Sequence, residues 1–222
     1  MAKAIIDIET LGYPLESFDE ERQKYLLKFA ETDTEREEAI QKLSLYPTTA
    51  QIIAIGLLNP ETERGKILFQ ANETLNYSSD DDNIRYVTGT EKEILEQFWQ
   101  DIAHYDQFIT FNGRGFDCPF LMLRSAILQV QPTCNLMPYR YDASIHCDLL
   151  EQFTFYNALR KFNLDFYCKS FGIDSPKANG ITGLDMKKLF EEKRFREIAE
   201  YNLGDLKATA ELFRRWEKFL SV

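Results

Sequence analysis

Runs of apolar residues divide the chain into strand-like and helix-like segments. Five runs rich in β-branched and apolar residues predict strands, and the second of them ends at Asn59-Pro60. In chain order, the expected strands are KAIIDIET, TAQIIAIGLLN, GKILFQA, DQFITFN and a stretch near Tyr141 to Asp148.

Apolar residues at helical spacing predict the other elements. Thr90 followed by Glu93 forms a capping-box pattern, which predicts a helix that begins at Glu91. The expected helices span Glu91 to His104, residues 116–129, Glu151 to Lys161, Asp165 to Phe171, Leu184 to Lys193 and Arg194 to Leu220. Strands, then alternating helices and strands, then helices predict an α/β fold with a mixed sheet flanked by helices.

A long, charged insertion separates the first two expected strands, at about residues 16–46. It carries mixed charge with apolar residues such as Tyr25 and Phe29 at helical spacing, which predicts one or two amphipathic helices before Pro47. Such a segment either covers the active site or decorates an edge of the fold. The polar and acidic run from Asn72 to Asn83 predicts an exposed loop.

The composition predicts one folded unit, a single domain over residues 1–222. A chain of 222 residues with 44% hydrophobic residues can bury a sizeable core. The opening MAKAIIDIET has no cleavage-site pattern, and no apolar run reaches the roughly 20 residues of a membrane helix, so we expect a cytoplasmic protein with no membrane contact. The four cysteines form no CxxC pair, which favours reduced thiols over a zinc site or disulfides.

The charge is negative overall but unevenly distributed. A formal charge of −10 and a pI near 4.8 argue against a protein that coats duplex DNA, because such binding depends on Lys and Arg. Residues 1–156 hold 13 basic and 26 acidic residues, whereas residues 157–222 hold 13 and 10. A surface for nucleic acid is therefore expected in the last third, although an ordinary solvated helix face explains those residues equally well.

Three short segments carry the candidate chemistry. Asp7 and Glu9 lie two residues apart on a strand, so they face the same way, although an isolated Asp-x-Glu is common on solvent-facing strands. Asp117 ends FNGRGFD at the start of a helix, where a carboxylate also gains from the helix dipole without any catalytic role. That junction of strand, loop and helix is, however, where α/β folds bind ligands.

Tyr201 and Asp205 complete this set from the last expected helix. They lie four residues apart and therefore on one helix face. Four carboxylates offer the oxygen ligands that Mg²⁺ or Mn²⁺ prefers, and two such ions roughly 4 Å apart stabilise the attacking and leaving oxygens in phosphoryl displacement. The combination predicts phosphodiester hydrolysis.

The order of DIET, FNGRGFD and YNLGD resembles the three exonuclease motifs of the DnaQ-like, or DEDD, superfamily of 3′–5′ exonucleases. The second motif is most similar to that of the proofreading domain of family B DNA polymerases. The motifs spread from residue 5 to about residue 215, so the resemblance covers nearly the whole chain. It implies a ribonuclease-H-like fold, and Tyr201, four residues before Asp205, implies the tyrosine subtype.

The resemblance also implies roles for single residues. Asp7 should contact both metal ions, Glu9 and Asp205 should complete the site of the ion that activates water, and Asp117 should serve chiefly the second ion. Tyr201 should orient the attacking water by hydrogen bonding, since an unperturbed tyrosine pKa is about 10.

Four further residues are expected near the substrate. The resemblance implies that Thr10 and Leu11 meet the 3′-terminal nucleotide and that Asn112 and Phe116 line the adjoining pocket. Core packing is an alternative interpretation for Leu11 and Phe116. Asp148 is either an added acid near the site or the cap of the following helix, and it stays outside the expected catalytic set.

Three hypotheses about function follow. The first is a 3′–5′ exonuclease that acts on single-stranded DNA ends and releases nucleoside monophosphates, using Mg²⁺ or Mn²⁺. The second is an exoribonuclease with the same site, since recognition of a 2′-OH needs only one or two polar groups. The third is a non-catalytic module that binds a nucleotide or a protein. The intact carboxylate set argues against the third, because clustered acids are costly to hold together without a cation.

Overall fold

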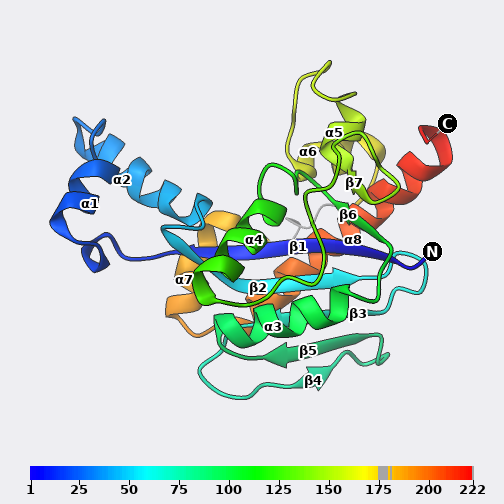
Figure 1. Cartoon of the computed structure of the whole chain (residues 1–222), viewed down its shortest axis with the longest axis horizontal. Helices are drawn as coiled ribbons and strands as arrows, with labels where there is room; N and C mark the ends of the chain where they lie inside the picture. Colours follow the sequence, from blue (N-terminus) through cyan, green and yellow to red (C-terminus); the bar gives the residue numbers. More distant parts are fainter. Residues whose placement is uncertain (175–179, 181, 222) are drawn as a thin grey trace.

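A seven-stranded mixed sheet forms the centre of the molecule (Figure 1). The computed structural model describes residues 1–174, 180 and 182–221. In sheet order the strands are β4 (Tyr77–Ser78), β5 (Ile84–Thr88), β3 (Gly65–Phe69), β2 (Ala50–Leu58), β1 (Lys3–Gly12), β6 (Gln107–Thr110) and β7 (His146–Asp148). Strand β1 is antiparallel to β2 and parallel to β6. The α/β class is confirmed, and the arrangement is compatible with a ribonuclease-H-like fold.

Helices cover both faces of this sheet (Figure 1). The α-helices are α1 (Glu20–Leu26), α2 (Asp33–Gln41), α3 (Glu91–Ile102), α4 (Asp117–Leu128), α5 (Leu149–Phe153), α6 (Leu164–Phe171), α7 (Met186–Glu191) and α8 (Phe195–Phe219). Short 3-10 helices occupy η1 (Leu15–Ser17), η2 (Lys42–Leu45) and η4 (Gly183–Asp185). The capping box expected at Thr90 and Glu93 is present and starts α3. Among the described helices, none combines the length and the apolar character needed to cross a membrane.

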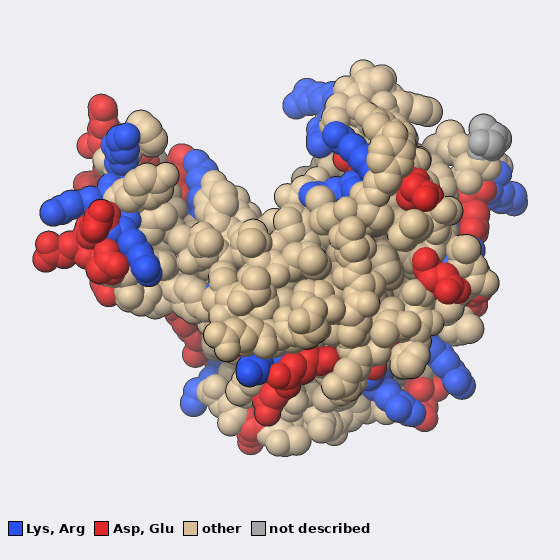
Figure 2. Space-filling view, viewed as in Figure 1, with Lys and Arg blue, Asp and Glu red and all other residues tan. Residues whose placement is uncertain are grey.

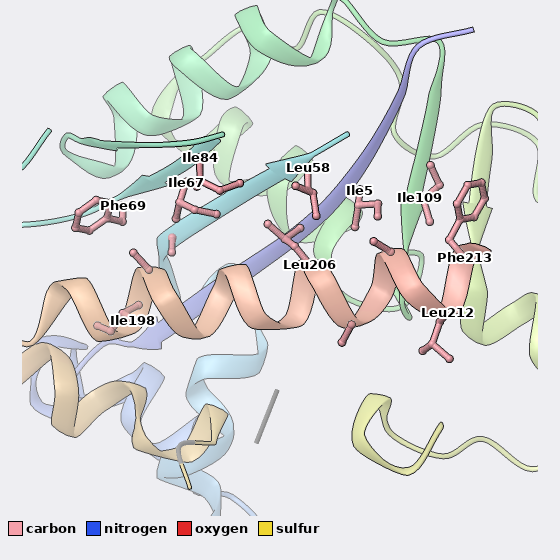
Figure 3. Packing of buried hydrophobic residues seen from close by; sticks show 14 of the residues in the cluster. Ile5, Leu58, Ile67, Phe69, Ile84, Ile109, Ile198, Leu206, Leu212 and Phe213 are labelled. Carbon is pink, nitrogen blue, oxygen red and sulfur yellow. The ribbon is translucent and has the colours of Figure 1, made fainter. Parts of the chain in front are cut away.

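The alternation of side chains along β1 separates two buried clusters. Ile5 lies in one cluster with Leu206 of α8, and Figure 3 shows α8 packed along this face of the sheet. Ile6 belongs to the other cluster, which includes residues of α3 and α4. Because every second side chain of a strand faces the same way, Asp7 and Glu9 project from the face that α8 covers.

One edge of the sheet departs from the predicted loop. Residues 77–78 form β4, and the following segment forms β5, which the apolar pattern did not predict. The rings of Tyr77 and Tyr86 stack with centroids 4.3 Å apart, and this cross-strand pair explains why a polar segment is drawn into the sheet. The turn between the two strands, at residues 79–83, matches the acidic run.

The segment between β1 and β2, residues 13–49, forms an arm that projects from the sheet (Figure 1). It contains two α-helices, but neither buries a residue, and Tyr25 and Phe29 are 77% and 83% exposed. The amphipathic prediction is therefore wrong in one respect, since no apolar stripe is buried. Local caps stabilise the helices instead, including a capping box of Thr32 and Glu35 in α2.

A second projection, the lobe of residues 136–172, contains β7, α5 and α6 (Figure 1). Two predicted elements are shorter here than expected. The strand expected from Tyr141 begins only at His146, because residues 139–145 form turns. The helix expected over Glu151 to Lys161 ends at Phe153, because residues 155–157 have φ angles of 47°, 55° and 75°, in the left-handed region.

The cysteines occur as free thiols, and Cys118, Cys147 and Cys168 are buried. Each lies within the packed interior rather than in a metal-ligating group of the described residues. This agrees with the prediction of reduced thiols.

Candidate active site

Three of the expected carboxylates meet where β1 passes α8. Asp7, Glu9 and Asp205 each offer one oxygen atom, and these three atoms lie within 4.8 Å of one another. Glu9 is 7% exposed, whereas Asp7 and Asp205 are partly buried. We call these three residues the acidic cluster. It joins residues almost 200 positions apart in the chain, which is why no local pattern alone could establish it.

The strand pairing leaves room for this approach. Gly56 of β2 lies opposite Asp7, and a Cβ atom at this position would collide with Asn202 and Leu206 of α8. The absent side chain therefore lets α8 lie close against the sheet. Beyond Glu9, the register of β1 and β2 shifts between Glu9 and Thr10, an irregularity often found next to active sites.

Asn202 is a site residue that the sequence reasoning missed. It is fully buried, and its Nδ2 donates a hydrogen bond of 2.7 Å to Asp7 Oδ2. Its Oδ1 has no hydrogen-bond partner among the described residues. The available signals were its place inside YNLGD, directly after Tyr201, and a glycine in the middle of the buried strand β2.

Asp117 lies at the start of α4 and reaches β1 by another route. Its Oδ1 accepts a hydrogen bond of 3.0 Å from the backbone N–H of Ile8, between the two carboxylates of β1. The parallel pairing of β1 and β6 ends at Ile5 and Ile109, so the carboxylate occupies a place where the sheet offers no further partner strand. Asp117 is only 4% exposed, but it is not part of the three-residue acidic cluster.

The carboxyl groups of the acidic cluster and of Asp117 disfavour the charged form of one another. Burial raises the pKa of Asp7 and Glu9 well above the usual range, and the charge of Asp205 raises both further. Burial likewise raises the pKa of Asp117 to about 7, against the lowering effect of backbone hydrogen bonds. Holding these groups as carboxylates near neutral pH therefore costs free energy, and a bound cation would remove that cost.

Tyr201 stands beside this cluster on α8, one turn before Asp205. Burial raises the pKa of Tyr201 far above its ordinary value, and the carboxylates of Asp205 and Glu9 add to the effect. The phenol thus keeps its proton over the whole physiological range. A hydrogen bond links its side chain to Asp205.

Thr10 and Leu11 lie at the base of the arm. Both line a cavity of about 460 Å³ between the end of β1, the arm and the segment that includes Lys187. The Oγ1 of Thr10 donates a hydrogen bond of 2.8 Å to the carbonyl of Ser44 in the arm. Leu11 is partly buried and packs against the α8-side core.

Asn112 and Phe116 belong to the loop between β6 and α4. Asn112 has a left-handed backbone, with φ of 64°, and lines a second cavity of about 460 Å³ on the lobe side. Phe116 packs on Phe120 with ring centroids 5.4 Å apart and is partly buried, so it does contribute to the core. The four residues implied as substrate contacts therefore lie in two regions and do not form one group.

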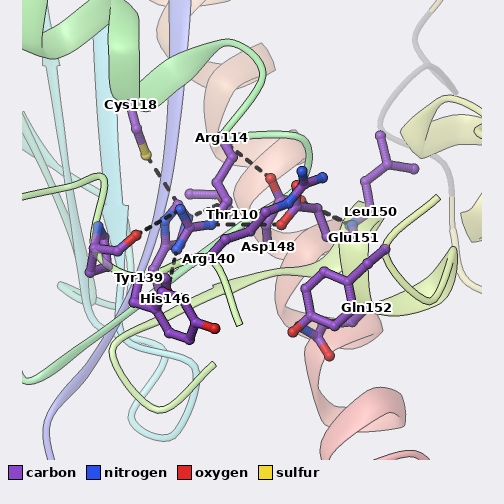
Figure 4. Close-up of polar contacts among 12 residues, drawn as sticks. Thr110, Arg114, Cys118, Tyr139, Arg140, His146, Asp148, Leu150, Glu151 and Gln152 are labelled. Carbon is purple, nitrogen blue, oxygen red and sulfur yellow. Dashed lines mark hydrogen bonds and ion pairs between the residues drawn. The ribbon is translucent and has the colours of Figure 1, made fainter. Parts of the chain in front are cut away.

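Asp148 caps α5 and fixes the loop before Asp117 (Figure 4). Its carboxylate accepts hydrogen bonds from the backbone N–H groups of Leu150 and Glu151 at the helix start, and from those of Asn112 and Arg114 in the loop. Of the two interpretations made from the sequence, the helix cap is confirmed. The carboxylate acts on the site by holding the loop rather than by joining the acidic cluster.

The donor set suits a hard cation. The ligand atoms of the acidic cluster are all carboxylate oxygens, and burial with mutual repulsion raises the pKa of Asp7 and Glu9, so a bound cation would favour their charged form. Such a centre can bind divalent cations and, through them, phosphate oxygens.

Comparison with known proteins agrees with this chemistry. In Sulfurisphaera ohwakuensis, a protein named DNA polymerase 1 is 26% identical over 171 residues, which cover 72% of this chain and 19% of that protein. A DNA polymerase 1 of Sulfolobus acidocaldarius is 29% identical over 131 residues, covering 55% of this chain and 15% of the relative. The chain thus spans a fifth or less of the length of these relatives.

A family match covers most of the chain. Residues 48–221 match the family described as "Predicted 3'-5' exonuclease related to the exonuclease domain of PolB". The matched segment includes Asp117, Tyr201 and Asp205 and begins after Asp7 and Glu9. The chain therefore belongs to this family of predicted exonucleases related to the PolB exonuclease domain.

Proposed function

We propose that this chain is a metal-dependent 3′–5′ exonuclease that degrades single-stranded DNA and releases nucleoside monophosphates. The observation that carries the proposal is the approach of Asp7, Glu9 and Asp205 to within 4.8 Å, in a member of an exonuclease family. The relatives named DNA polymerase 1 support DNA as the polymer. The proposal treats residues 1–222 as one exonuclease domain of the tyrosine subtype, in the cytoplasm.

Two divalent cations, Mg²⁺ or Mn²⁺, would supply the positive charge that acidifies a water molecule and stabilises the attacking and leaving oxygens. In the proposal, Asp7 would contact both ions, and Glu9 and Asp205 would complete the first ion's site. Asp117 would serve the second ion, directly or through water. The raised pKa values of Asp7 and Glu9 support this assignment, because these carboxyl groups lack a countercharge of their own.

The chain's own residues orient the reaction. Hydrolysis joins a water oxygen to the last phosphorus and breaks its bond to the 3′ oxygen of the preceding nucleotide, which takes up a proton. Tyr201 stays protonated, so it orients the attacking water through its O–H group and does not act as a base. Asn202 holds one oxygen of Asp7 through its 2.7 Å hydrogen bond and leaves the other for the ions.

The residues that follow Glu9 and those that precede Asp117 contact different nucleotides of the substrate in this proposal. Thr10 and Leu11 follow Glu9 directly, so the cavity that they line accepts the 3′-terminal nucleotide. Asn112 and Phe116 lie in the loop that leads to Asp117 and border the neighbouring nucleotide, between the acidic cluster and the second cavity. The arm forms one wall of the first cavity, and in this proposal it favours single-stranded over duplex ends, because a second strand would have to pass it.

A time course on DNA labelled at its 5′ end tests the function. With Mn²⁺, the wild type should produce a ladder that shortens by one nucleotide at a time from the 3′ end. Asp7→Ala should lower kcat/KM by more than about 100-fold, beyond the loss typical of outer-shell partners alone. Asp80→Ala, in the exposed turn at the far edge of the sheet, serves as the matched control and should act like the wild type.

The other outcomes identify the competing functions. Faster degradation of a matched RNA oligomer would assign the chain as an exoribonuclease. Internal cuts would indicate an endonuclease. Binding of oligonucleotide without any metal-dependent release of mononucleotides, unchanged by Asp117→Ala, would leave the non-catalytic module as the correct hypothesis.

A further inference from the structure

Two exposed tyrosines, Tyr139 and Tyr141, form a row on the lobe with the partly buried Tyr156. The ring centroids of Tyr139 and Tyr141 lie 5.7 Å apart, and those of Tyr141 and Tyr156 lie 4.7 Å apart. Tyr139 and Tyr141 are 73% and 57% exposed, so large aromatic surfaces face solvent. We call these three residues the tyrosine row. Neighbouring rings in the row meet edge to face, at 64° and 60°, so the surfaces open for stacking of unpaired bases are the exposed faces of Tyr139 and Tyr141.

The backbone of the lobe builds this row by an unusual turn. The chain ends α5 at Phe153 and takes left-handed φ angles at residues 155–157, where Tyr156 has φ of 55°. Bulky residues rarely adopt this conformation, and such outliers cluster at functional sites. Here the turn brings Tyr156 back against Tyr141, and Gln152 donates a hydrogen bond of 2.9 Å to the Tyr156 hydroxyl.

A positively charged cavity adjoins the row. This cavity of about 460 Å³ is lined by Arg114, Arg140 and Lys161 together with the carboxylates Asp148 and Glu151. Both carboxylates are buried and already bonded, Asp148 to backbone N–H groups and Glu151 to the arginines. Three cations against two carboxylates leave one positive charge unmatched in the cavity.

Lys161 supplies this free charge. Among the residues that the structure describes, no ion pair is formed by Lys161, although it is exposed. Arg114 is 7% exposed at its side chain, and its Nε donates no hydrogen bond within the described part of the chain. In an acidic protein, such an excess of cations at one cavity selects a single negative group such as a phosphodiester.

The cavity borders the loop that leads to the candidate active site. It also includes Asn112 and Gly115, which belong to the loop that ends at Asp117. Figure 2 shows a broad hollow between the arm and the lobe, with basic side chains on the part of the lobe that borders it. A strand whose 3′ end lies at the acidic cluster therefore reaches this cavity with a more upstream phosphate.

We propose that the tyrosine row and its adjoining cavity bind the single strand upstream of the 3′-terminal nucleotides. Bases stack on Tyr139 and Tyr141, which Tyr156 supports from behind, while Arg140 and Lys161 contact a phosphate. The proposal rests on the proposed function, because it takes the strand to end at the acidic cluster. It gives the enzyme a preference for substrates long enough to span both sites.

Binding to fluorescein-labelled DNA, measured by anisotropy in EDTA, tests the site without hydrolysis. Tyr139→Ala should raise the Kd for a 12-nucleotide strand about 10-fold, which is within the effect of one lost stacking contact. Lys161→Ser should reduce the slope of log Kd against log salt by about 0.7, the value for one phosphate of a single strand. The Kd for a trinucleotide should change less than about 2-fold, because it occupies only the positions next to the cluster.

A second aromatic and cation pair provides the matched control. Lys218 lies 5.2 Å above the ring of Phe219, which is 62% exposed, at the far end of α8. This pair is 14 residues beyond Asp205, or roughly 20 Å along the helix. Phe219→Ala and Lys218→Ser should bind both DNAs like the wild type.

Three results would overturn the proposal. If Tyr139→Ala and Lys161→Ser bound the 12-nucleotide strand with the affinity and salt slope of the wild type, these residues would not form a binding site. Equal losses on both DNA lengths would place the residues at the terminal nucleotide instead, and equal losses in the control variants would make the effect nonspecific. Thermal melts of each variant show that the fold is intact. A wild type that binds in this way but never hydrolyses DNA would refute the proposed function alone.

Discussion

Two buried charged regions of this protein, the acidic cluster and a group in the lobe, differ in whether their carboxylates have partners of opposite charge. At the acidic cluster, like charges are held together, and burial with mutual repulsion raises the pKa values of Asp7 and Glu9. In the lobe, Arg114 and Arg140 surround the buried carboxylate of Glu151, and Asp148 is bonded to backbone N–H groups (Figure 4). We call the second region the lobe network.

The difference separates a cluster that needs a cation from a network whose carboxylates already have partners within the chain. The buried carboxylates of the lobe network are bonded to backbone N–H groups and arginines, and Asp148 fixes the loop that leads to Asp117. Within the described residues, the side chain of Asn202 is the donor to the carboxylate of Asp7, and the acidic cluster is stabilised by whatever cation it binds. Substitutions should therefore affect stability in the lobe network and activity in the acidic cluster.

The largest effect on stability is expected from Glu151→Gln. This change leaves Arg114 buried without its countercharge, and the ion pair from Arg140, at 2.6 Å, is lost as well. The free energy of unfolding should fall by about 3 kcal/mol, as when one partner of a buried pair is removed. Urea unfolding monitored by circular dichroism measures it.

An exposed ion pair gives the matched control for that change. Glu38→Gln removes the partner of Lys42 in the arm, where both side chains are more than half exposed, and should cost less than about 0.5 kcal/mol. If Glu151→Gln and Glu38→Gln were equally mild, the lobe network would not be a structural element.

Asn202→Ala should act on the other region. Without the hydrogen bond to Asp7, that carboxylate is no longer held in one orientation, and kcat/KM should fall about 10- to 100-fold. The Mn²⁺ concentration for half-maximal activity should rise in the same variant, a readout that a purely structural role would not move. Asn59→Ala removes an asparagine that caps a remote turn and should leave both quantities unchanged. Unchanged metal dependence in Asn202→Ala would exclude the positioning role.

Asn202 also marks the limit of what the sequence predicts. The i and i+2 spacing of Asp7 and Glu9 and the i and i+4 spacing of Tyr201 and Asp205 are local, so both pairs could be placed on a strand and a helix in advance. The contact of Asn202 with Asp7 depends instead on Gly56 opposite Asp7 and on α8 packing there. Single-sequence spacing contains no information about either.

The same limit explains the errors in the lobe and at the sheet edge. Helical spacing predicted a helix through Tyr156, but the left-handed turn at residues 155–157 is selected by contacts with Tyr141 and Gln152. Strand β5 escaped prediction because it is short and gains its stability from Tyr77 against Tyr86. Elements with long apolar repeats, such as α3 and α8, were predicted close to their observed bounds.

The smallest predicted effect uses pH to compare the two regions. Burial lowers the pKa of His146, behind the lobe network, to about 3. This group therefore lowers the protein's free energy of unfolding as pH falls below about 6.5, its pKa in the unfolded chain. The pKa of Asp117 is raised to about 7, so in metal-free protein this group raises the free energy of unfolding as pH falls through 7. Between pH 6.5 and 5.5, each contributes about 1 kcal/mol, with opposite signs.

Urea unfolding at these two pH values, in EDTA, separates the two contributions. On acidification, the free energy of unfolding should rise by about 1 kcal/mol more in His146→Gln than in the wild type, and by about 1 kcal/mol less in Asp117→Asn. The asparagine keeps an oxygen for the Ile8 N–H, so it removes the titration while retaining the contact. A wild-type pH response in Asp117→Asn would mean that this carboxyl group is not held against its charge. Asp117 would then not belong with the carboxylates that need a cation, and the contrast with the lobe network, whose carboxylates have partners within the chain, would not include it.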